Sequence, residues 1–275
     1  MKVDIAGVLV DNISKEETLK KIDEFVSSGN PHLIVTTYSE FIVYASRDSS
    51  YKKVLNSADL SLPDGIGILW AAKLLKLKVK SEKLKVLECL WQVIYSGASI
   101  IFKPSFVRSE IKEQITGSRL IWDIARLASE KGYSISLIGG EDGVGVLAGI
   151  ELKKKFPELK INLIVSGNTF DDQLAGGIAG SNSDILLIAY SPPKQETWLA
   201  QNLSKLNVKV ALGLGGTFDY IAKKRPKSPD FMHYMGLEWL WRLITQPWRI
   251  KRMWNAIPVF IAIVYSYKVH KVKSL

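Results

Sequence analysis

The hydrophobic positions between residues 32 and 216 follow two alternating patterns. Compact runs rich in Val, Ile and Leu predict buried strands, and segments with apolar residues three or four positions apart predict helices. The compact runs lie at residues 32–38, 59–63, 133–140, 160–167, 183–190 and 208–216. The helical segments lie at residues 39–58, 65–75, 118–132, 143–157 and 194–206, with Ser39 as the expected N-cap of the first. This alternation predicts an α/β fold with a mostly parallel sheet covered by helices.

Two segments depart from this alternation. Residues 74–117 contain a helical segment of their own at about residues 82–96 and indicate an insertion or a flap at the sheet edge. Residues 256–267 are apolar, but this run is only about half of the ~20 residues that a membrane-spanning helix needs. We therefore expect the second segment to lie in the plane of a membrane or to pack against the protein.

Charge is distributed unevenly along the 275 residues, which carry a net charge of +10. Residues 222–275 hold 11 Lys/Arg and 2 Asp/Glu, whereas residues 1–221 hold 26 and 25. The C-terminal segment also contains four of the eight tryptophans, namely Trp239, Trp241, Trp248 and Trp254. We therefore expect a core at residues 1–221 and a basic, Trp-rich appendage at residues 222–275.

The composition of this appendage leaves three interpretations open. Tryptophan and basic side chains suit the headgroup level of an anionic membrane, and the same side chains suit nucleic acid. The third interpretation is a helical hairpin that packs its tryptophans inward. No RRM, KH or helix-turn-helix pattern occurs in the sequence, so we expect no nucleic-acid partner. A single cysteine, Cys89, and an N-terminus unlike a signal peptide indicate a cytoplasmic protein.

Two glycine-rich loops follow predicted strands, at residues 139–145 and 213–219. Gly139 and Gly140 begin the first, and such glycines let backbone N–H groups approach a phosphate. A plain tight turn explains each loop equally well. Because the carboxyl ends of parallel strands meet at one sheet edge, the two loops together suggest a nucleotide or diphosphate ligand.

A third loop, "SPPKQETW" at residues 191–198, combines two prolines with Lys194, Gln195 and Glu196. A stiff loop that directs an amide and a cation at a ligand suits a sugar or a uracil. The alternative is an ordinary helix start with Glu196 in its first turn.

Asp64 stands in "LPDGIG", where one apolar run ends at Pro63 and Gly65 and Gly67 precede the next. A carboxylate at a strand end can cap a helix or take part in chemistry. No metal-binding pattern occurs, since the histidines are far apart and HExxH, paired cysteines and Asp-x-Asp are absent from the sequence. We therefore expect no metal or cofactor, and Arg, Lys and backbone amides would hold any phosphate charge.

Several motifs resemble those of the WecG/TagA/CpsF glycosyltransferases. "VTTYSEF" resembles T-x-N-x-E, "LPDGIGILWAA" resembles DG-x-G-x-x-x-A, and "EQITGSRL" resembles ER-x-x-G-x-D-L. "SPPKQETW" resembles G-x-P-x-Q-E-x-W, "GLGGTFD" resembles G-x-G-x-x-F-D, and residues 225–254 resemble the long C-terminal motif of the family. The resemblance covers most of the chain.

This resemblance implies a Rossmann-like core with helices on both faces and a C-terminal helical appendage that reaches the membrane. It implies an inverting, metal-independent transfer of an N-acetylmannosamine-type sugar from a UDP-sugar to polyprenyl-diphosphate-linked N-acetylglucosamine. Such a step belongs to the synthesis of cell-surface polysaccharide or of a teichoic acid linkage unit. The enzyme would act at the inner face of the cell membrane. Separately from the resemblance, an isolated catalytic cleft could need a neighbour's loop to close it, so a homo-oligomer is an open alternative to a monomer.

The resemblance also assigns site residues. Asp64 matches the base that takes the acceptor proton, and Arg242 matches an appendage arginine that closes over the diphosphate of UDP. Thr36 and Gln195 match positions near the ligand, and Tyr38 stands where the family has Asn. Gly139 and Gly140 are the expected nucleotide-loop residues.

Two further departures accompany Tyr38, because Gln114 replaces the Arg of ER-x-x-G and Arg119 replaces the Asp of G-x-D-L. Such changes can redirect specificity for the donor sugar. They also motivate a second interpretation, a non-catalytic, membrane-associated sugar-nucleotide-binding member of the same family.

Overall fold

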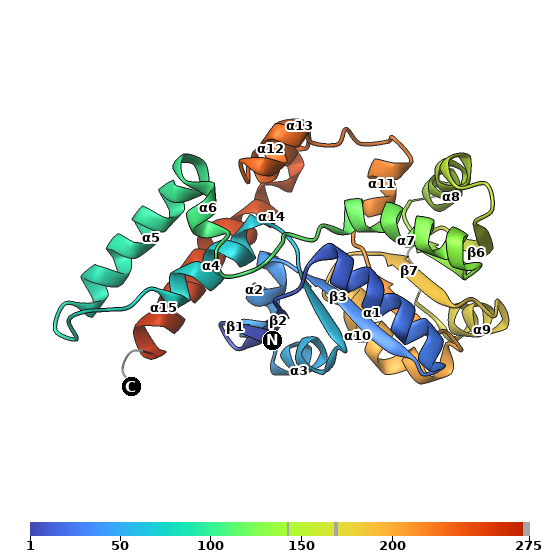
Figure 1. Ribbon diagram of the computed structural model, residues 1–275, viewed down its shortest axis with the longest axis horizontal. Helices are drawn as coiled ribbons and strands as arrows, with labels where there is room; N and C mark the ends of the chain where they lie inside the picture. The colour runs from blue at the N-terminus through green and yellow to red at the C-terminus, as the bar shows by residue number, and fades with distance from the viewer. Residues whose placement is uncertain (142, 168–169, 272–275) are drawn as a thin grey trace.

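Six parallel strands form the central sheet of the computed structural model, which describes residues 1–141, 143–167 and 170–271 (Figure 1). Their order across the sheet is β4-β3-β8-β7-β5-β6. The strands are β3 (His32–Thr37), β4 (Leu60–Pro63), β5 (Ser134–Gly139), β6 (Lys160–Val165), β7 (Ile185–Ala189) and β8 (Val210–Gly213). All six pair in parallel, so the predicted α/β fold with its parallel sheet is confirmed.

Helices cover both faces of this sheet. Successive strand residues point to opposite faces, so Leu33 and Val35 belong to one hydrophobic cluster and Ile34 to the other. The first cluster contains residues of α2 (Ser39–Arg47), α3 (Ser49–Ser57), α4 (Ile66–Lys76), α9 (Asp172–Gly180) and α10 (Lys194–Asn202), which a short turn, η1 (Leu203–Lys205), follows. The second contains residues of α1 (Lys15–Ser28), α7 (Gly117–Lys131), α8 (Val144–Lys155) and α11 (Thr217–Ile221).

The prediction of a single helix at residues 39–58 is wrong, because Asp48 divides this segment into α2 and α3. The backbone of Asp48 is extended, and its side chain accepts hydrogen bonds from the N–H groups of Ser50 and Tyr51. Asp48 therefore caps the second helix. Ser39 is also not a cap, since it is the first helical residue and Tyr38 holds the N-cap position without a side-chain bond.

The predicted insertion contains α5 (Lys85–Phe102) and the short α6 (Pro104–Val107). The helix expected at residues 82–96 therefore exists, but it begins three residues later and ends six residues later. In Figure 1, α5 lies beside α15 (Phe260–Lys271) at the end of the molecule away from β6.

The C-terminal segment is helical and packs back onto the core. After α11 it forms α12 (Asp230–Tyr234), α13 (Glu238–Thr245), η2 (Pro247–Arg249), α14 (Ile250–Trp254), a π-helical turn η3 (Asn255–Val259) and α15. Phe260 and Val264 of α15 are buried in the first hydrophobic cluster, as the packing interpretation of residues 256–267 expects. Within the described ranges, no helix is both long and apolar enough to cross a membrane. Residues 272–275 of the expected appendage lie outside the described residues.

An N-terminal hairpin, which the sequence analysis did not anticipate, completes the fold. Strands β1 (Lys2–Ile5) and β2 (Val8–Asp11) pair antiparallel around Ala6 and Gly7, both with positive φ. Asp11 accepts a hydrogen bond from the Ser61 N–H, which ties the hairpin to β4.

Candidate active site

Asp64 lies at the carboxyl edge of the sheet, directly after β4. Its N–H donates to the Thr37 carbonyl over 2.9 Å, and its Oδ2 accepts from the N–H of Gly117 over 3.3 Å. Gly117 is the first residue of α7, so the carboxylate lies at the positive end of that helix dipole. The N-cap of α4 is Gly65, and α4 has no side-chain cap. Asp64 therefore does not cap the helix that follows it in sequence.

Burial raises the pKa of Asp64 to about 7. This value already includes the lowering effects of Arg242, the Gly117 N–H and His233 and the raising effect of Glu238. A carboxylate with a pKa near neutrality is a stronger base than an ordinary aspartate and is still ionised in a large fraction of molecules at pH 7.

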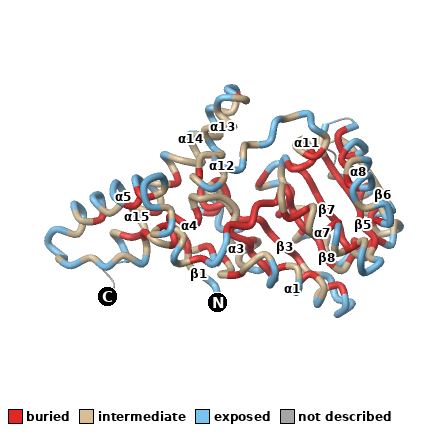
Figure 2. Tube along the Cα trace, turned by 45° about the horizontal axis from the view of Figure 1, so that its top comes forward, coloured by how far each residue is buried: buried red, intermediate tan, exposed pale blue. Residues whose placement is uncertain are grey.

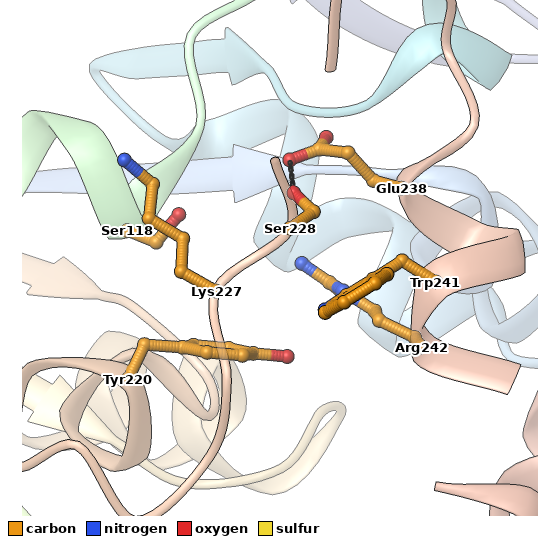
Figure 3. A pocket seen from close by; sticks show the side chains of 7 residues that line it. All are labelled: Ser118, Tyr220, Lys227, Ser228, Glu238, Trp241 and Arg242. Carbon is orange, nitrogen blue, oxygen red and sulfur yellow. Dashed lines mark hydrogen bonds between the residues drawn. The ribbon is translucent and has the colours of Figure 1, made fainter. Parts of the chain in front are cut away.

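Arg242 comes from α13 of the C-terminal segment and lies at the same edge. Its guanidinium carbon is 5.7 Å from the centre of the Tyr220 ring. Burial lowers the pKa of Arg242, but Tyr220, Glu238 and Asp64 raise it by more, so the guanidinium stays charged. Figure 3 shows this side chain in a small pocket beside Trp241, with the Tyr220 hydroxyl pointing toward it. The pocket is lined by Ser118, Tyr220, Lys227, Ser228, Glu238, Trp241 and Arg242.

A larger cleft of about 600 Å³ lies near the start of α7. Gln114 and Thr116 line it from the segment that leads into α7, and Arg119 lines it from the first turn of that helix. Arg108 and Lys227 add positive charge. The Thr116 hydroxyl and the Gln114 carbonyl oxygen are buried without a protein partner among the described residues. The cleft is thus polar and cationic, and Thr116 directly precedes the Gly117 N–H that holds Asp64.

Thr36 and Gln195 are buried and bonded within the protein. The Thr36 hydroxyl donates to the Gly213 carbonyl over 2.9 Å and so joins β3 to β8. The Gln195 carbonyl oxygen accepts from the N–H groups of Tyr190 and Gly215, and its amide nitrogen donates to Glu196. These bonds fix the loops at the sheet edge, and a direct ligand contact by either side chain stays a prediction.

Glu196 is a feature that the sequence analysis interpreted only as a first-turn acid. Its side chain is fully buried, and burial raises its pKa to about 7. It accepts hydrogen bonds from Gln195 and from the Tyr51 hydroxyl, the latter over 3.2 Å. This buried acid joins α10 to α3 and so helps to fix the loop between β7 and α10. The alternation of the sequence offered no signal for this burial.

Gly139 and Gly140 form the turn at the end of β5, and both have positive φ. A Cβ on Gly139 would lie 2.7 Å from the Ala189 carbonyl oxygen, so β7 leaves no room for a side chain there. The Gly140 N–H donates to that same carbonyl over 3.2 Å. Close strand packing therefore requires Gly139, and a phosphate contact by this loop stays a prediction. Asp142 of the loop lies outside the described residues.

Tyr38 contacts the C-terminal segment, because its hydroxyl accepts a hydrogen bond from Arg252 Nη2 over 3.3 Å. The same guanidinium forms two bonds to the buried carboxylate of Glu40, of 2.7 and 3.2 Å. Sequence reasoning missed this pair, although Glu40 is the acidic residue of the T-x-N-x-E match.

No group of three or more His, Cys, Asp or Glu side chains that could hold a metal ion occurs in the part of the chain that the structure describes. The candidate site combines Asp64 at the sheet edge, Arg242 and its pocket from the C-terminal segment, and a cationic cleft beside them.

Comparison with known proteins shows the family of this chain. Residues 3–95 and 82–274 match the glycosyl transferase WecG/TagA/CpsF family. The chain belongs to this family. The family resemblance of its motifs is thereby confirmed, and the chain is a glycosyltransferase by family.

Curated relatives from this family share about a quarter of their residues with the chain. A Bacillus subtilis protein is 27% identical over 95% of this chain and 87% of its own length. A Staphylococcus aureus protein is 24% identical over 99% and 93%, and one from Bacillus spizizenii is 28% identical over 86% and 79%. Each is named N-acetylglucosaminyldiphosphoundecaprenol N-acetyl-beta-D-mannosaminyltransferase.

Proposed function

We propose that this chain transfers an N-acetylmannosamine-type sugar from a UDP-sugar to polyprenyl-diphosphate-linked N-acetylglucosamine, in the synthesis of cell-surface polysaccharide or of a teichoic acid linkage unit. The names of the relatives support the sugar and the acceptor. The UDP donor, inversion at the anomeric carbon and independence of metal ions come from the family resemblance.

The observation that carries this proposal is the position of Asp64, with its raised pKa, beside Arg242. Asp64 takes the proton of the acceptor hydroxyl while that oxygen forms a bond to the anomeric carbon of the donor. The bond between this carbon and the phosphate oxygen breaks, and its electron pair leaves with UDP. Attack opposite the leaving group inverts the anomeric configuration.

The leaving diphosphate gains negative charge as this bond breaks. Arg242 and Lys227 line the pocket at the same edge, and Arg108 and Arg119 line the adjoining cleft. Fixed cations in a partly water-excluded site stabilise such developing charge. These side chains therefore supply the role that a divalent cation has in other transferases.

The acceptor is a lipid, so the enzyme works at a membrane surface, which we propose is the cytoplasmic face. Exposed apolar side chains on the C-terminal segment include Ile244, Trp248, Ile250 and Trp254. Together with the basic charge of this segment, they suit the headgroup layer of an anionic bilayer.

A transfer assay with purified protein tests the proposal. It uses a short-chain polyprenyl-diphosphate-N-acetylglucosamine acceptor and a panel of UDP-sugars, with EDTA present, and follows UDP release. Asp64→Asn should lower the rate by a factor on the order of 10²–10⁴. Asp59→Asn is the matched control, because it changes the same charge at the amino end of β4, where Asp59 accepts a bond from the Leu33 N–H.

Release with one sugar, retained in Asp59→Asn and lost in Asp64→Asn, is the expected result. A requirement for added divalent cation would refute metal independence. No release with any sugar, from protein that still binds UDP, would instead favour the non-catalytic sugar-nucleotide-binding interpretation.

A further inference from the structure

Helix α5 carries its large apolar side chains on the outside. Leu87 is 64% exposed, Trp91 65% and Phe102 84%, and Leu90, Ile94 and Ile101 are also exposed. The first four along the chain recur at intervals of three and four, and Ile101 follows Ile94 by seven, or about two helical turns, so these residues lie on one side of the helix as an apolar stripe. Figure 2 shows α5 at the periphery of the molecule, away from the sheet.

The opposite side of α5 faces the protein, and Val93 and Ile100 on this side pack, partly buried, against the first hydrophobic cluster. Its buried residues are Cys89, Ser96 and Ser99. Trp70 of α4 donates its indole N–H to the Ser96 hydroxyl over 2.9 Å, and Tyr265 of α15 donates to the Val86 carbonyl over 3.1 Å. A helix in water usually buries its large apolar side chains, whereas α5 leaves most of its own exposed, and the bonds to α4 and α15 hold the helix in this orientation.

Basic side chains flank the apolar stripe at both ends. Lys76, Lys78, Lys80 and Lys83 are exposed in the chain before α5, and Lys103 is exposed after it. The two acids of this stretch are Glu82 and Glu88, and the carboxylate of Glu88 accepts the backbone N–H groups of Lys80 and Ser81. An apolar stripe with an exposed Trp and Tyr, bordered by lysines, matches the composition of a bilayer interface with anionic headgroups.

We propose that the exposed face of α5 is a membrane-docking surface, which lies in the headgroup layer of an anionic bilayer with its axis in the membrane plane. This surface is separate from the C-terminal segment and goes beyond the function proposed above. Helix α5 and the C-terminal segment are close together, since a Cβ on Gly236, between α12 and α13, would lie 3.0 Å from the side chain of Ile100. Docking through both would fix the orientation of the catalytic edge over a lipid-linked substrate.

Vesicle co-sedimentation of the full chain tests this surface. The probes are vesicles of phosphatidylglycerol mixed with phosphatidylcholine, and vesicles of phosphatidylcholine alone. The test variant is Leu87→Glu/Trp91→Glu/Ile94→Glu, which changes three exposed positions on the stripe. The matched control is Val146→Glu/Leu147→Glu/Ile150→Glu, which changes three exposed apolar positions on α8, at the far end of the molecule (Figure 1).

We expect the α5 variant to bind the mixed vesicles at least about tenfold more weakly than the α8 variant, although both carry the same change in charge. Binding of the unchanged chain should weaken with salt and on neutral vesicles. Equal binding by the two variants would overturn the proposal. So would loss of self-association in the α5 variant with vesicle binding intact, because the face would then be an interface between two copies of this chain.

A labelling experiment tests the same surface without charge changes. Cys89 is the only cysteine, so Cys89→Ala allows one environment-sensitive dye at Ile94→Cys or, as the control, at Leu147→Cys. The dye at position 94 should shift to shorter wavelength when mixed vesicles are added, and the dye at position 147 should not. Identical responses at the two positions would refute docking through α5.

Discussion

The amide nitrogen of Gln114 lies 3.3 Å from a carboxylate oxygen of Glu238 on α13. Gln114 is one of three residues that depart from the family motifs, and the other two make similar contacts. Arg119 forms a 2.6 Å ion pair with Asp230, and the Tyr38 hydroxyl bonds to Arg252. All three departures therefore contact the C-terminal segment. These shared contacts indicate that the three residues hold the C-terminal segment over the site. The three departures from the family motifs can therefore be explained without the loss of a sugar ligand.

Arg252→Met should loosen the C-terminal segment. The substitution leaves the Glu40 carboxylate, which is buried, without its cation. Because the Arg252 side chain is 39% exposed, we expect a loss of about 1–3 kcal/mol, less than a fully buried pair would give. In limited proteolysis, the variant should be cleaved between residues 222 and 260 faster than the unchanged chain. Arg126→Met, which removes an exposed partner of Asp123 and Glu130, is the control and should cut like the unchanged chain.

The rate of transfer should depend on the ionisation of Asp64. Its pKa of about 7 means that the base is protonated, and therefore inactive, in acid. We expect kcat/KM for the unchanged chain to rise with pH and to level off above a midpoint near pH 7. A rate that is constant down to pH 5 would contradict a base with this pKa.

Arg242→Met should change both the rate and the pH profile. Loss of one cation near the leaving diphosphate costs on the order of 10²–10³ in kcat. Arg242 also lowers the pKa of Asp64, so its removal should move the midpoint of the acid limb to higher pH. Lys224→Met, a charge loss at an exposed position, should change neither the rate nor the midpoint. An unchanged midpoint would show that the charge of Arg242 does not affect the pKa of Asp64.

The sequence predicted the sheet, and which candidate residues gather at one of its edges, better than it predicted the contacts between them. Short apolar runs predict parallel strands, and the rule that ligands bind beyond their carboxyl ends places Asp64, Gly139 and Gln195 at one edge. The pairs that join Gln114 to Glu238 and Glu40 to Arg252 span more than 120 residues, and no local pattern encodes such separations.

Local errors have local causes. The break at Asp48 arises because its carboxylate competes for the backbone N–H groups of the next turn. The hairpin at Ala6 and Gly7 was detectable, since alternating apolar residues flank a glycine-containing turn. The exposed face of α5 was not detectable from the sequence. Helical periodicity predicts an apolar stripe but does not predict which side of the helix faces the protein.

Asp64→Asn should stabilise the protein above pH 7 while it lowers activity. The pKa of this group is about 7 in the folded protein against an ordinary value of 3.8, so the folded state binds the proton more tightly. Stability from this group is then complete below about pH 4 and is lost as pH rises through 7. The Asn variant lacks this loss. Its melting temperature should exceed that of the unchanged chain by a few degrees above pH 7, with no difference near pH 4. A lower melting temperature above pH 7 would contradict the burial of this charge.

Two Gly→Ala substitutions should change stability in opposite directions. In Gly139→Ala, the added methyl group meets the Ala189 carbonyl oxygen at 2.7 Å, and the residue has a φ of 109° that an L side chain rarely adopts. We expect a loss of about 2–4 kcal/mol and, because β5 and β7 must separate, weaker UDP binding. Gly177→Ala lies in α9, with nothing within 4 Å of the added atom, and should gain about 0.5–1 kcal/mol from reduced freedom of the unfolded chain. Urea titration monitored by circular dichroism measures both changes. Equal stabilities of the two variants would show that the end of β5 can accommodate a side chain. The presence of glycine at position 139 would then have to be explained by ligand binding.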